Sequence, residues 1–384
     1  MRYRLIIDGE VLMEHNAFTK EDSVKIKGIA IILMLIHHCF LNADRYKGQE
    51  VIFAPFSEAV WNEWGLYFKI CVALFVFTSA YGLTISFKNV NSDFNMPREK
   101  VVRIITARYI KLISAYMFVF MMLQLYSLVM QKGRYAYIYG SKPTGIIYML
   151  IDMLGLADII GTPTFIATFW YMGFAQMIIF GMPLFIAVYK RGGGILLAAV
   201  AFMAAYVPAY TYGEFQRYII CIASGIWCAD KDFFAMLRNQ PVFCSRIPPR
   251  AAKTARFAIY FLLLYEMERL REGDLKTVLL PVLDAVIPIV VIGFLIEFVN
   301  PIPLIGNVLN VLGRHSMNIF LVHNFIRIVW YYDFTYSFQY AGMIVSVLMG
   351  ISLLVSVCIE WIKKLVHFNQ AVDWVIKRIL SGSA

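Results

Sequence analysis

A lysine and a histidine eleven residues apart in the first apolar stretch are the residues of this sequence best suited to chemistry. Lys27 and His38 lie within residues 24–41, where most other side chains are apolar. Eleven residues make almost three helical turns, so both side chains share one face, roughly 16 Å apart along the axis. Such a face offers a cation for an anionic group at one end and an imidazole for proton transfer at the other. Ionisable groups inside a bilayer are costly, so we expect His38 to be functional, and His37, about 100° around the helix, to be structural.

Other cations at the ends of apolar stretches extend this pattern. Arg108 and Lys111 lie three residues apart at the start of the third stretch, and hence on one helix face. Together with Lys27 they predict a cationic cluster that binds phosphate groups, because the guanidinium group matches phosphate in a bidentate geometry. The alternative is that these cations only anchor helix ends on the cytoplasmic side.

Three further residues lie deeper in apolar stretches. His323 and Arg327 are four apart on one helix face, and they could contact an acceptor, polarise a carbonyl group or only satisfy neighbouring helices. Asp284 could orient an imidazole, or it could form an ion pair with a buried cation such as Arg327 or Lys69. Aromatic residues near the outer helix ends predict an interfacial belt more than a sugar-stacking surface: Trp61, Trp64, Tyr67, Trp330, Tyr331, Tyr332 and Tyr336.

The composition is that of a multi-span membrane protein. Hydrophobic residues make up 60% of the chain and charged residues only 16%, whereas soluble domains are about half apolar and about one quarter charged. The net charge of +10 is spread over short segments between apolar stretches, which does not predict a nucleic-acid groove. The six cysteines form no CxxC or Cys/His ligand pattern, so we expect neither a disulfide framework nor a metal site.

With about 20 apolar residues as the length of one span, the sequence predicts an all-α integral membrane protein of about ten transmembrane helices. These lie near residues 24–41, 66–87, 105–130, 164–189, 195–210, 216–230, 255–266, 277–299, 313–332 and 341–362. Residues 145–161 contain two aspartates and predict a re-entrant or interfacial helix. We expect one transmembrane domain over 1–384, with a short lead-in (1–23) and a tail (364–384), both cytoplasmic. In the lead-in, Asp8-Gly9 between two short apolar stretches is a weak hairpin signal.

The distribution of cations predicts the orientation. With the amino terminus inside, 24 of the 35 Lys and Arg residues fall in cytoplasmic segments. Cytoplasmic loops carry such an excess, so we expect a multi-pass protein of the cell membrane with both termini in the cytoplasm. Lys25 and Lys27 precede the first span and no small-residue cleavage pattern follows it, so it is a retained helix.

The sequence resembles the membrane-bound acyltransferase-3 family, which puts acyl groups on sugars. Lys27-x10-His38 resembles the family's first helix, and Arg108-Tyr-Ile-Lys111 resembles its Arg-x-x-Arg, with Lys in the second place. Three more stretches follow in the family's order: residues 71–81, with Ala80 in place of a Gly; residues 169–172, followed by Gln176 where many members carry Glu; and residues 312–323.

The resemblance implies an O-acyltransferase that moves acetyl from cytoplasmic acetyl-CoA to a hydroxyl group. The acceptor would be a carbohydrate, either a cell-surface or exported glycan or its lipid-linked precursor, and acetyl-CoA would be a substrate and not a permanently bound cofactor. His38 would be the base, and coenzyme A phosphates would bind the cationic cluster. Two alternatives remain open: a proton-coupled transporter, since buried His, Arg and Asp also fit a carrier, and an acyltransferase of a small lipid or antibiotic. The internal repeats and paired broken helices typical of carriers are not evident in the sequence.

Overall fold

The computed structural model describes residues 5–7, 10–12, 18–207, 213–239 and 248–381. Apart from one small hairpin, the regular structure of these residues is helical. The hairpin consists of β1 (Leu5–Ile7) and β2 (Glu10–Leu12), which pair antiparallel with Leu5 opposite Leu12. It agrees with the hairpin signal, although Asp8 and Gly9 themselves lie outside the described residues.

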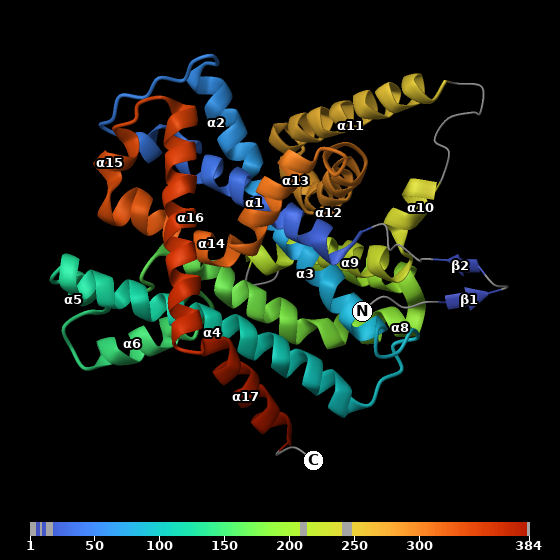
Figure 1. Ribbon diagram of the computed structural model, residues 1–384, viewed down its shortest axis with the longest axis horizontal. Coiled ribbons are helices and arrows are strands. Elements are labelled where there is room, and N and C mark those ends of the chain that lie inside the picture. Colours follow the sequence, from blue (N-terminus) through green and yellow to red (C-terminus); the bar gives the residue numbers. More distant parts are fainter. Residues whose placement is uncertain (1–4, 8–9, 13–17, 208–212, 240–247, 382–384) are drawn as a thin grey trace.

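The first half of the chain extends from α2 at the top of the view to α4 and α8 at the bottom (Figure 1). Its helices are α1 (Lys20–Phe40), η1 (Ala43–Tyr46), α2 (Glu58–Tyr67), η2 (Phe68–Ile70), α3 (Cys71–Lys88), α4 (Arg98–Met130), α5 (Arg134–Tyr139), α6 (Thr144–Met153), α7 (Ala157–Ile160), η3 (Ala167–Phe169) and α8 (Trp170–Tyr206).

The helices of the second half pack between and beside those of the first half. Its helices are α9 (Gly213–Asp230), α10 (Phe233–Asn239), α11 (Pro249–Glu272), α12 (Lys276–Phe294), η4 (Leu295–Val299), α13 (Pro303–Arg314), α14 (Ser316–Asn324), η5 (Phe325–Trp330), α15 (Tyr332–Tyr336), α16 (Ala341–Leu365) and α17 (Phe368–Ser381). Figure 1 shows α1 and α3 near the middle of the molecule, with α5 and α6 at one end and α17 at the edge.

Among the described residues, six helical runs are long and apolar enough to cross a membrane, so the predicted count of about ten is not confirmed. The six are Lys20–Phe40, Glu58–Lys88, Arg98–Met130, Ala167–Tyr206, Lys276–Val299 and Ala341–Leu365. The predicted spans 195–210, 216–230, 255–266 and 313–332 do not stand as separate long apolar helices. The first lies in α8 after the backbone becomes non-helical at Gly192 and Gly193, the next two lie in helices with several charged residues, and the last is divided between α13, α14 and η5.

Residues 145–161 form no long helix. They make α6 and α7 with a turn between them, and Asp152 in α6 is buried. Its carboxylate accepts hydrogen bonds from the Tyr139 hydroxyl (2.7 Å), the Thr164 hydroxyl (3.0 Å) and the Phe165 N–H (2.6 Å). Because the carboxylate binds groups on both sides of the segment in sequence, it holds α5, α6 and the approach to η3 together.

Helix α1 begins at Lys20, four residues before the predicted span, because Thr19 and Asp22 form a capping box. The Asp22 N–H donates to the Thr19 hydroxyl (3.1 Å), and the Thr19 N–H donates to Asp22 (2.8 Å). Asn300 also donates to Asp22 (2.7 Å), which ties the start of α1 to the segment before α13.

Two glycines allow α1 and α13 to touch along their backbones. A Cβ atom at Gly28 would lie 2.2 Å from the Leu309 carbonyl oxygen, and one at Gly313 would lie 1.8 Å from that of Val24. Small residues are typical of such close helix crossings in membranes. This contact sets the depth and rotation of α1, and therefore the direction in which its histidines point.

Candidate active site

The two adjacent histidines of α1 have different surroundings. His37 is buried, and its Nδ1 lies 2.7 Å from the Gly65 carbonyl oxygen in α2, so Nδ1 carries the proton and donates. His38 is partly exposed, and its Nδ1 has no hydrogen-bond partner. The structure thus places His37 in a helix–helix contact and leaves the buried Nδ1 of His38 without a hydrogen-bond partner.

His323 of α14 faces His38, with 5.0 Å between the ring centroids. The His323 ring is fully buried, and its Nδ1 lies 2.8 Å from the Phe320 carbonyl oxygen and 3.1 Å from that of Ile319. Since carbonyl oxygens only accept, Nδ1 carries the proton, and the unpartnered Nε2 is a bare acceptor. In this tautomer His323 can take a proton but cannot donate to a carbonyl group, so it cannot polarise one.

Arg327 is the third member of this cluster and is 0% exposed. Its Nε donates to the Asn324 side-chain oxygen (3.0 Å) and its Nη1 to the Tyr336 hydroxyl (3.3 Å), while Nη2 has no partner. None of the ion pairs among the described residues involves Arg327. A buried guanidinium group with only neutral partners is costly, so this side chain is poised for an anion.

A π-helical turn and contacts with neighbouring side chains hold Arg327 in position. It lies in η5, a π-helix that follows α14, and π-helical turns are frequent at functional sites. The Tyr336 hydroxyl donates to the Cys39 carbonyl oxygen (3.2 Å), which joins Arg327 to the residue after His38. Phe165 and Phe169 pack against Phe325 with ring centroids 5.0 and 5.9 Å apart, and they support η5 from the other side.

Sequence reasoning did not assign Asn324 or Tyr336 to the site. Tyr336 was expected in the aromatic belt, but it is 1% exposed and lies in the core. Burial raises the pKa of its hydroxyl, which therefore keeps its proton for the Cys39 carbonyl oxygen. A tyrosine four residues from the next belt aromatic, Tyr332, gives no local signal of this role.

Of the predicted phosphate-binding cations, the structure brings two together. Lys27 and Arg108 lie close enough for their charges to act on each other, and the Arg108 Nη2 donates to the Ser86 hydroxyl (2.8 Å). Neither belongs to an ion pair among the described residues. Lys111 instead lies 3.5 Å from the Asp373 carboxylate of α17, with both side chains more than half exposed.

Asp284 does not join the histidines. Its carboxylate is fully buried and accepts from the Arg217 Nε (2.7 Å) and from Arg271, which is itself 2% exposed. Both oxygens are used by arginines, so neither is left to orient an imidazole. Asp284 therefore forms an ion pair, which was one of its two predicted roles, but its partners are Arg217 and Arg271 and not Arg327 or Lys69.

Gln176, where many family members carry Glu, has a structural position. Its Nε2 donates to the Leu154 carbonyl oxygen (2.9 Å) and holds α8 against the turn between α6 and α7. A Glu at this position could not make this bond as a carboxylate.

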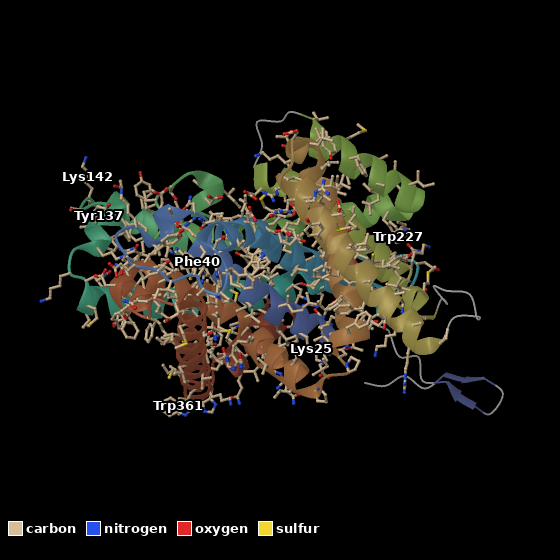
Figure 2. All side chains as sticks on the ribbon, turned by 90° about the horizontal axis from the view of Figure 1, so that it is seen from above. Lys25, Phe40, Tyr137, Lys142, Trp227 and Trp361 are labelled. Carbon is tan, nitrogen blue, oxygen red and sulfur yellow. The ribbon has the colours of Figure 1, made fainter. Side chains whose placement is uncertain are left out.

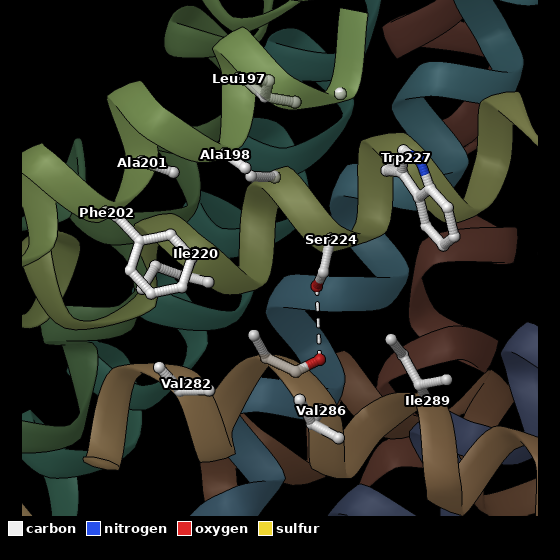
Figure 3. Close-up of a pocket in the computed structure, with 13 residues that line it drawn as sticks. Leu197, Ala198, Ala201, Phe202, Ile220, Ser224, Trp227, Val282, Val286 and Ile289 are labelled. Carbon is white, nitrogen blue, oxygen red and sulfur yellow. Dashed lines mark hydrogen bonds between the residues drawn. The ribbon is translucent and has the colours of Figure 1, made fainter.

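An apolar cavity of about 330 Å³ lies between α8, α9 and α12 (Figure 3). Its lining includes Leu197, Ala201, Ile220 and Val286, and the Ser224 hydroxyl in its wall donates to the Ala285 carbonyl oxygen (3.3 Å). This lining offers no base and no charge, so the cavity itself has no group for proton transfer.

The model of the acyltransferase domain family known as acyltransferase-3 matches residues 26–361, which include His38, His323 and Arg327. No curated protein and no solved structure matches the chain.

Proposed function

Since the chain belongs to the acyltransferase-3 family, and is thus a membrane acyltransferase, we propose that it transfers acetyl from cytoplasmic acetyl-CoA to a hydroxyl group of a glycan. The glycan would be exported, exposed on the cell surface or still attached to a lipid carrier. The observation that carries this proposal is the cluster of His38, His323 and Arg327, where two imidazoles and one uncompensated guanidinium group meet with unpartnered nitrogens.

These residues supply the groups that acyl transfer needs. In the proposed reaction the acceptor hydroxyl oxygen attacks the thioester carbonyl carbon while His38 takes the hydroxyl proton. The oxyanion of the tetrahedral intermediate forms beside the free Nη2 of Arg327, and charge stabilisation of this kind is often the largest catalytic contribution. Collapse expels the thiolate of coenzyme A, which takes the proton from the imidazolium ring, so an ester and free coenzyme A are the products.

His323 is expected to position the acceptor in the proposed reaction. Its ring is held by two backbone carbonyls, and its bare Nε2 lies on the side that is left for the His38 ring or a substrate hydroxyl. We propose that it accepts a hydrogen bond from a second hydroxyl group of the acceptor and so orients the attacking hydroxyl group, whose proton goes to His38.

We propose that Lys27 and Arg108 bind the phosphates of coenzyme A. Both lie near the cytoplasmic side in the predicted orientation, and neither has a carboxylate partner among the described residues. The roughly 16 Å between Lys27 and His38 along the helix would let the pantetheine arm reach from phosphate site to imidazole.

We expect Arg108→Ala to raise the KM for acetyl-CoA about tenfold while the KM for the acceptor changes little, because one charge-assisted phosphate contact contributes about 1.5–3 kcal/mol. Lys111→Ala should have a smaller effect, since its ammonium group already faces Asp373 and solvent. The measurement is coenzyme A release from purified protein at varied donor concentration. An unchanged donor KM in the Arg108 variant would leave that residue as a topological anchor.

We propose ten membrane crossings with both termini in the cytoplasm. Helix α8 would cross twice, because its backbone is non-helical at Gly192 and Gly193. Before this break Lys190 donates to Asn95 (2.9 Å), and after it Tyr206 donates to the Val278 carbonyl oxygen (2.5 Å) at the start of α12. The helices α9, α11 and α14 with η5 would supply the other three crossings.

Contacts between distant segments support one common orientation. Segments predicted to be cytoplasmic contact one another: Lys25 with Asn300, Lys88 with Asp230, Arg108 with Ser86, and Lys190 with Asn95. Segments predicted to be external do the same: Gln49 with Asp333, Lys69 with Glu214, and Gln131 with Val329.

Single cysteines at Lys142 and Lys231, in a background whose native cysteines are replaced by serine, should therefore react from opposite sides. Both side chains are exposed, and Lys142 lies at the left edge of the molecule in Figure 2. We expect a membrane-impermeant maleimide to label the Lys142 position in intact cells and the Lys231 position only after lysis. Labelling of both positions in intact cells would contradict the ten-span topology.

A further inference from the structure

A second guanidinium group without an ion pair lies near the histidine cluster, in the segment that follows α1. Arg45 belongs to η1, which follows α1 directly, and it is half-buried. Its charge acts on His37, His38 and Arg327, so the group lies near the cluster. Burial, and then the Arg327 charge, lower the pKa of Arg45.

The carboxylates of this outer region do not neutralise Arg45. Asp44, its neighbour in the chain, is exposed and forms no ion pair with it among the described residues. Glu58 accepts a hydrogen bond from the Tyr46 hydroxyl (2.7 Å), and Asp333 accepts one from Gln49 (2.7 Å). Asp44 acts on Arg45 only through its charge, so the two arginines and two histidines have no carboxylate in ion-pair contact among the described residues.

We infer that Arg45 binds an anionic group of the acceptor, a carboxylate or a phosphate, so that this enzyme modifies an acidic glycan; the inference rests on the proposed acyl transfer. Two neighbouring guanidinium groups repel each other in a site of low dielectric constant, and a bound anion converts that repulsion into attraction. Arg45 would hold the anion in a bidentate contact, while Arg327, deeper in the site, is left for the oxyanion. A neutral sugar would leave Arg45 unpaired, which is the way a site rejects a substrate that lacks an expected group.

The test compares one acidic oligosaccharide with its neutral counterpart on the full-length protein in lipid nanodiscs. The probes are trigalacturonic acid, the same trisaccharide with its carboxyl groups reduced, and galactose 6-phosphate as a phosphate-bearing sugar. Binding is measured without acetyl-CoA, and coenzyme A release is measured with it. The variants are Arg45→Gln, Arg45→Lys and, as a matched control two residues away and exposed, Lys47→Gln.

We expect at least one acidic probe to bind roughly ten- to a hundredfold more tightly than the neutral trisaccharide, as one charge-assisted contact implies. Arg45→Gln should remove that preference by raising the Kd and KM of the acidic probe with kcat nearly unchanged. Arg45→Lys should keep part of the preference for the acidic probe. Lys47→Gln should keep the whole of this preference. The choice between trigalacturonic acid and galactose 6-phosphate distinguishes a carboxylate from a phosphate.

Three results would overturn the inference: equal binding of acidic and neutral sugars, binding of none of the probes, or an equal loss for both kinds of sugar in Arg45→Gln. Failure of the proposed acyl transfer would look different. In that case no probe would stimulate coenzyme A release, although the acidic probe would still bind in an Arg45-dependent way.

Discussion

Replacing His38 with alanine is expected to abolish acyl transfer while the protein still inserts and folds. The loss should be about 10²–10⁴-fold in turnover, because the variant has no group at this position to take the proton of the acceptor hydroxyl. The His38 Nδ1 makes no hydrogen bond, so removing the ring breaks no hydrogen bond of this atom and loses only the ring contact with His323. The measurement is coenzyme A release per folded protein, with acetyl-CoA and an acceptor present.

His37→Ala on the same helix is the matched control. This change removes the bond between Nδ1 and the Gly65 carbonyl oxygen, which should lower the free energy of unfolding by about 1 kcal/mol but leave most of the transfer activity. The activity of the unmodified protein should also fall at acid pH, since a protonated imidazole cannot accept a proton. An inactive His37 variant beside an active His38 variant, in equal amounts of folded protein, would refute the assignment.

Arg327→Gln should have an effect of similar size on kcat, about 10²–10³-fold, with little change in the KM for acetyl-CoA. The expected loss is that for removal of one oxyanion donor from a preorganised site. Arg327→Lys should recover only part of the rate, because an ammonium group cannot keep the contacts to Asn324 and Tyr336 in the same fork geometry. Single-turnover measurement of ester formation separates this step from donor binding.

Arg271→Gln is the matched control, because it makes the same substitution at another buried arginine. Arg271 and Arg217 neutralise the buried Asp284, and breaking a buried ion pair costs about 3–5 kcal/mol. We therefore expect less folded protein from Arg271→Gln, with near-normal turnover in the folded fraction. Arg327→Gln removes a charge that has no counter-ion, so its stability should be kept or improved. If Arg327→Gln unfolds the protein, then Arg327 serves packing and the oxyanion role is refuted.

The sequence by itself determined the properties that depend on composition and on local periodicity. An excess of apolar residues requires a membrane protein, and α1 has to place His37 and His38 about 100° apart around its axis. The prediction of separate helices over 164–189 and 195–210 marks the same place at which α8 breaks, because glycines at 192 and 193 release the backbone. The sequence also placed Lys27 and Arg108 near one membrane boundary, whereas their approach to each other depends on how α1 and α4 are packed.

Only the tertiary structure decided which buried polar groups meet. Asp284 binds Arg217 and Arg271, residues on two other helices, because the packing of α9 and α11 against α12 brings both arginines to it. Tyr336 is likewise buried because α15 turns back toward α1, whereas composition alone places a tyrosine of this region at the interface.

In the candidate site, too, some features follow from the sequence and others only from the tertiary structure. His38 was evident from its own helix, but its pairing with His323 required the packing of α14 against α1, and the position of Arg327 required a π-helical turn. The hydrogen bonds of an α-helix and of a π-helix use the same backbone groups, so the choice between them is made by side-chain contacts such as those of Phe325 with Phe165 and Phe169. Those contacts join residues about 160 positions apart, and no local pattern in the sequence encodes them.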